Sequence, residues 1–141
     1  MKKIVFLTGL LALAVLMIGF LTAAAPTPVT PVTTFTLVQG LPSTMNVGET
    51  YTVVVQVDSD VQFLNALANP SFQFPGKGVV AVQGGDHAGS GTTATLQITY
   101  KAKSDTSRMP GNFAPVHFVI GVRYGGGYVA GQDYVFNVTV P

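Results

Sequence analysis

The chain has 141 residues, of which 9% are charged and 48% are hydrophobic, and it contains no cysteine and no tryptophan. Its net charge of +1 provides no basic surface for a nucleic acid. The lack of cysteine excludes a disulfide framework, a thiolate metal site and a cysteine nucleophile, and the length predicts one modest domain.

The N-terminus has the order of parts that is typical of a secretory signal peptide. Met1, Lys2 and Lys3 form a positive start, and residues 4–21 are uncharged and apolar. The small residues 22–25 follow directly before Pro26. Because signal peptidase tolerates proline poorly at the first mature position, we place the cut after Ala24. Residues 1–24 are therefore predicted to be a hydrophobic signal helix.

A retained membrane anchor is the alternative for this segment. Its 18-residue apolar run exceeds the roughly 7–15 residues of a usual signal core and is long enough to span a bilayer. In either case Lys2 and Lys3 keep the N-terminus cytoplasmic, so the remainder is exported. The sequence predicts a secreted or cell-surface protein. It contacts the membrane only if its N-terminal segment stays uncleaved.

A linker rich in threonine and proline is predicted at residues 25–33. Pro26, Pro28 and Pro31 disfavour a helix and favour an extended, semi-rigid spacer. The folded domain is then predicted to occupy residues 34–141.

Alternation of apolar and polar residues, the pattern of half-buried strands, dominates this domain. It is clearest at residues 51–58, 94–101, 116–123 and 134–140, and weaker at 34–38, 61–67, 71–74 and 79–83. Clusters of Gly, Pro, Asn and Asp separate these segments and predict turns, including one at residues 58–60. Seven or eight short strands favour an antiparallel β-sandwich, with a barrel as the competitor.

Two segments carry a family resemblance. Residues 47–55, Val-Gly-Glu-Thr-Tyr-Thr-Val-Val-Val, resemble the entry to the second strand of bacterial immunoglobulin-like surface domains, and residues 134–140 resemble their closing strand. This resemblance implies an immunoglobulin-like β-sandwich over residues 34–141. Residues 89–103 are also similar to the middle of cohesin modules, although the cohesin pattern is missing between Gln62 and Gln83.

No catalytic, cofactor-binding or metal-binding residue is predicted. Asp58 and Asp60 could offer carboxylates to Ca²⁺, but a polar turn is the favoured interpretation. His87 and His117 are interpreted as unrelated histidines, because no nucleophile elbow, zinc motif or phosphate-binding loop accompanies them.

The candidate contact residues lie in two aromatic segments. Tyr124 and Tyr128 flank three glycines at the last predicted hairpin, next to Arg123. Rings at the end of a sandwich can stack on sugars or anchor a protein, although they can equally cap the core. Phe72 and Phe74 share one face of a short segment between prolines and are the second candidates.

Three functions remain open. The favoured one is a non-catalytic structural or adhesive surface protein that assembles with itself through strand edges, because the outward strand positions are neutral and rich in threonine. The alternative is a module that binds a surface glycan or protein through the Tyr124 and Tyr128 loop. The least favoured is a small hydrolase that joins a histidine to Asp86, Asp105 or Asp133.

Overall fold

The computed structural model describes residues 27–69 and 78–141. The predicted signal segment, the predicted strand at 71–74 and both Phe72 and Phe74 lie outside these residues. No helix in the described ranges is long and apolar enough to cross a membrane. The strands are β1 (Thr33–Gln39), β2 (Thr50–Asn69), β3 (Val80–Gly84), β4 (His87–Ala88), β5 (Gly91–Ala102), β6 (Ala114–Tyr124) and β7 (Val129–Val138).

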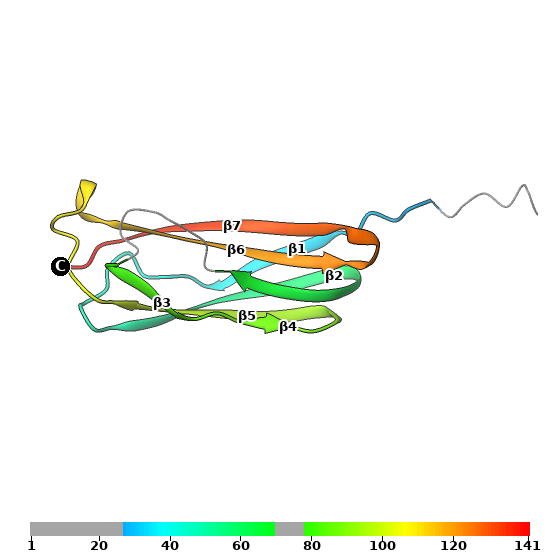
Figure 1. Cartoon of the computed structure of the whole chain (residues 1–141), viewed down its shortest axis with the longest axis horizontal. Coiled ribbons are helices and arrows are strands. Elements are labelled where there is room, and N and C mark those ends of the chain that lie inside the picture. The colour runs from blue at the N-terminus through cyan, green and yellow to red at the C-terminus, as the bar shows by residue number, and fades with distance from the viewer. Residues whose placement is uncertain (1–26, 70–77) are drawn as a thin grey trace, which may run out of the picture. The chain divides into compact units, whose positions relative to one another are not determined.

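Strand β2 organises the fold because its two halves pair with different neighbours. Residues 50–58 pair with β1 and β5, whereas residues 63–69 pair mainly with β6 and β4. Further out, β3 pairs with β5 and β7 pairs with β6 (Figure 1). These ladders are all antiparallel, and they form the groups β1-β2-β5-β3 and β4-β2-β6-β7. The described residues are thus mostly antiparallel sheet, consistent with the predicted all-β sandwich.

The predicted turn at residues 58–60 is wrong, because β2 runs through these residues as one strand with a shifted register. Polar side chains bond the backbone at this irregularity. Ser59 Oγ accepts the N–H of Val61 at 3.3 Å, and Asp60 Oδ1 accepts the N–H of Val32 at 2.8 Å. Bulges and turns both leave backbone N–H and C=O groups without a partner on the neighbouring strand. Both therefore favour serine and aspartate, whose side chains can bond the backbone.

The alternating patterns are confirmed by the buried core. Phe118 lies near its centre and stacks on Tyr134 and Phe136, with ring centroids 5.0 and 5.9 Å apart. Inward positions of the sheets supply the remaining apolar contacts. They include Val53, Val55, Val57, Leu96, Ile98, Tyr100, Val116, Ile120, Val122 and Val138.

The first strand pairs within its own chain. The segment that follows β1 then crosses to the residues after β7, where Met45 N–H donates to Thr139 O at 3.0 Å and Thr139 N–H donates to Ser43 O at 2.8 Å. In the described residues, no strand pairs with the second edge of β1, and β7 has β6 as its one strand partner. Both sheets therefore end in an open strand.

Candidate functional site

Tyr124 lies inside the protein. Its side chain is 2% exposed, and its ring meets Phe63 edge-on with centroids 6.5 Å apart. The hydroxyl donates to Ser59 Oγ at 2.8 Å and lies 2.5 Å from Thr33 Oγ1. Tyr124 thus joins β6, β2 and β1, and this burial removes it as a direct contact residue.

Tyr128 and Arg123 are the exposed members of the predicted contact loop. A 3₁₀ turn at Gly125–Gly127 closes the hairpin, with φ of +73° at Gly126 and +85° at Gly127. The backbone N–H of Tyr124 donates to Tyr128 O at 2.9 Å, and the Tyr128 side chain is 41% exposed.

We call the group β4-β2-β6-β7 the second sheet. Its outward residues form a surface without net charge that we call the outer face. Inward residues of β6 are buried, so the alternate residues, Arg123 among them, point away from the core. The strand register then defines the rows of the outer face. These rows are Asn65–Arg123–Val129, His87–Leu67–Gly121–Gly131 and Asn69–Val119–Asp133, followed by His117–Val135.

Gly121 of β6 and Gly131 of β7 pair in the middle of the outer face and place no side chain there, and we call this pair the glycine row. A methyl group built on Gly121 would meet nothing within 4 Å. The outer face also carries exposed apolar side chains. Leu67 lies in the same row as the two glycines, Val129 is 63% exposed in the next row, and Val135 is 61% exposed two rows away on the other side. The centre of the outer face therefore combines two glycines with exposed apolar side chains.

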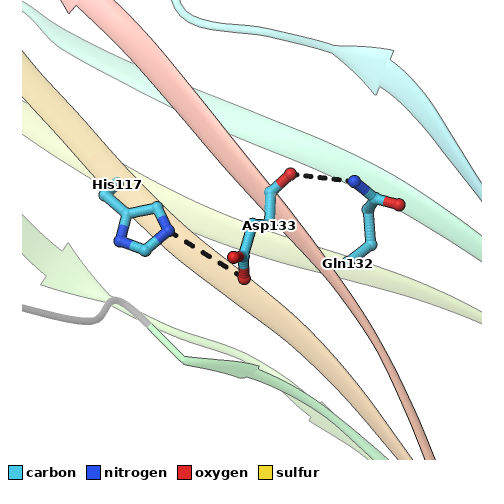
Figure 2. Close-up of polar contacts among 3 residues, drawn as sticks. All are labelled: His117, Gln132 and Asp133. Atoms are coloured by element: carbon cyan, nitrogen blue, oxygen red, sulfur yellow. Dashed lines mark hydrogen bonds and ion pairs between the residues drawn. The ribbon is translucent and has the colours of Figure 1, made fainter.

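His117 and Asp133 come together on this face, from neighbouring strands (Figure 2). The two atoms His117 Nε2 and Asp133 Oδ1 are 4.0 Å apart, which is longer than a hydrogen bond. The Asp133 side chain is 70% exposed, so water screens this contact. Gln132 Nε2 donates to the Asp133 carbonyl at 3.0 Å beside it.

The two histidines share the outer face but lie far apart. His87 is two strands and four residues away from His117, which corresponds to about 16 Å from ordinary strand spacings. A single metal ion cannot bridge that separation at ligand distances near 2 Å. Among residues 27–69 and 78–141, no group of three His, Cys, Asp or Glu side chains gathers as an ion site.

The other predicted carboxylates hold loops and strands in place. Asp86 accepts the N–H of His87 at 2.8 Å and the N–H of Gln97 at 3.2 Å. Asp105 accepts hydrogen bonds from the side chain and backbone of Ser107, which lower the pKa of Asp105. Of the three carboxylates in the hydrolase hypothesis, Asp133 is the one whose side chain lies beside a histidine side chain, that of His117.

Comparison with known proteins gives a weak likeness to a solved structure. No protein-family model matches the sequence, and no curated protein matches it. Among solved structures, the native conformation of alpha-2-macroglobulin from E. coli is similar over 79% of this chain, with 14% identity and a TM-score of 0.42. This chain spans 6% of the length of that protein.

Proposed function

We propose that this chain is a non-catalytic, extracellular structural or adhesive surface protein that associates with itself through strand edges. The export signal predicted at residues 1–24 supports the extracellular location. Amino-terminal sequencing of the exported protein tests it, with Ala25 expected as the first residue. A chain that stays in the cytoplasm would overturn this part of the proposal.

The domain is proposed to be immunoglobulin-like on the basis of its strand order. The group β1-β2-β5-β3 corresponds to strands A-B-E-D of that fold, and β2-β6-β7 corresponds to C-F-G. A continuous β2 then takes the place of two separate strands B and C. Such domains present their sheets and edges for contact with other molecules.

The observation that carries the assembly proposal is the near absence of charge on the open edge strands β1 and β7. All seven residues of β1 are uncharged, and β7 has Asp133 as its one charged residue. Natural edge strands are commonly blocked by lysine, proline or a covering loop, because an open edge pairs readily with another strand. Uncharged and unpaired edges favour strand addition between copies.

A matched pair of lysine substitutions tests edge association. Thr36 lies on β1 directly opposite Gln56 of the central strand β2, and both side chains are exposed. We expect Thr36→Lys to lower the average mass in sedimentation, because the charge lies on the edge. Gln56→Lys adds the same charge away from the edge and should leave the mass unchanged. Equal effects of the two variants would contradict edge association.

The alternative function is binding of a surface glycan or protein through the hairpin end. The exposure of Tyr128 beside the exposed Arg123 favours it. This hypothesis expects a monomer that loses binding in Tyr128→Ala, measured on an array of immobilised glycans and surface proteins. Binding that survives this substitution would exclude the hairpin end as the contact.

A further inference from the structure

We propose that the outer face is a second self-association surface, on which two copies pack face to face about a two-fold axis that runs along the glycine row. The inference rests on the proposed self-association, but it names a contact that is separate from the strand edges. Its support is the arrangement of charge and bulk around Gly121 and Gly131.

Arg123 and Asp133 do not pair with each other within one chain, and the side chain that Asp133 contacts is that of His117. Arg123 and Asp133 lie on neighbouring strands on opposite sides of the glycine row. Strand spacings place their backbone positions about 14 Å apart, which is too far for an ion pair. One face therefore carries a separated positive and negative group, with the glycine row between them.

A two-fold axis along the glycine row brings these opposite charges together. The rotation reverses the strand direction, so the row of Asp133 in the second copy lies over the row of Arg123. Asp133 of the second copy then lies opposite Val129. Val129 is the strand partner of Arg123, and neighbouring strands are about 4.8 Å apart. The same contact forms twice, as a two-fold interface requires.

The exposed apolar residues and the two glycines fit the same arrangement. Gly121 and Gly131 place no side chain between the two sheets at the axis. The exposed Leu67 lies in the same row and meets Leu67 of the second copy, and the exposed Val129 flanks the axis. Burial of these exposed side chains supplies the favourable free energy, and the two charge pairs fix the orientation. A second copy of this chain is thus the occupant that the charge pattern matches.

Charge reversal followed by mixing tests this contact. Arg123→Asp leaves two acidic groups on the face and Asp133→Arg leaves two basic groups, so each variant alone should associate at least about tenfold more weakly than wild type. An equimolar mixture should restore association as a heterodimer, because both pairs are then opposite in charge. Sedimentation and native mass spectrometry of the chains in the form that cells export measure this.

A size substitution provides a second, independent readout. Gly121→Val adds a side chain at the axis, where a built methyl group meets no atom of the chain within 4 Å, and valine favours a strand. We expect unchanged or higher thermal stability together with weaker association. Association that is unaffected by both charge reversals, or that mixing does not restore, would overturn the face contact while leaving edge association intact. A monomeric wild-type protein would overturn both proposals.

Discussion

The hydroxyl of Tyr124 donates a 2.8 Å hydrogen bond to Ser59 Oγ and so joins the end of β6 to the point where β2 changes its register. Thr33 Oγ1, at the start of β1, contacts the same hydroxyl. One phenol therefore connects the entry of the folded domain to both sheets. This placement gives Tyr124 a structural role and leaves Tyr128 to the surface.

We expect Tyr124→Phe to lower the free energy of unfolding by about 1 kcal/mol, because the ring stays buried while the hydroxyl contacts are lost. Urea denaturation measures the change. Tyr128→Phe is the matched control, since its side chain is partly exposed, and it should have almost no effect. Equal stabilities of Tyr124→Phe and wild type would show that the hydroxyl network contributes nothing.

Gly126 has a φ of +73°, in the left-handed region, although no atom lies within 4 Å of a built methyl group. Gly126→Ala should therefore destabilise the protein by about 1 kcal/mol through backbone strain alone. Gly125→Ala is the control, because that position is equally open and needs no positive φ. Thermal unfolding of the two variants should differ, and identical midpoints would contradict this account of the turn.

Thr106 ties the loop before β6 to the C-terminal residues. Its hydroxyl contacts the carbonyl oxygens of Asn112 and Val140, at 2.8 and 3.0 Å, and accepts the N–H of Val140 at 3.0 Å. Thr106→Val should lower the free energy of unfolding by about 1–3 kcal/mol, because a buried N–H loses its acceptor. Thr106→Ser keeps the hydroxyl and should retain most of the stability. Similar losses in both variants would point to packing instead.

The pKa of Glu49 is held below its ordinary value of 4.5 by hydrogen bonds from the Asn46 side chain and backbone. A lowered folded-state pKa stabilises the fold above pH 4.5, and that contribution is lost as the pH falls through the lowered value. Glu49→Gln should therefore be less stable than wild type at neutral pH and approach it in acid. A difference that is independent of pH, measured by urea denaturation, would contradict this.

Much of the fold could be predicted from local sequence, because a half-buried strand repeats every two residues. The series Val116, Phe118, Ile120, Val122 also continues to Tyr124, and this continuation could have predicted that Tyr124 is buried. Tyr128 follows the glycine turn and belongs to no such series.

The outer face could not be assembled from local patterns in the same way. His117 and Asp133 meet because Arg123 pairs with Val129, and that register follows only once the hairpin is fixed. Local sequence also does not predict that β2 is continuous, because Ser59 and Asp60 suit a bulge as well as a turn. Pairing partners distant in sequence decide between these two structures.

Sedimentation equilibrium of the wild-type protein, in the form that cells export, tests the central claim of self-association most directly. The account predicts an average mass that rises with concentration above that of one chain, because uncharged open edges favour strand addition. A mass that stays at that of a single chain at every concentration would contradict it.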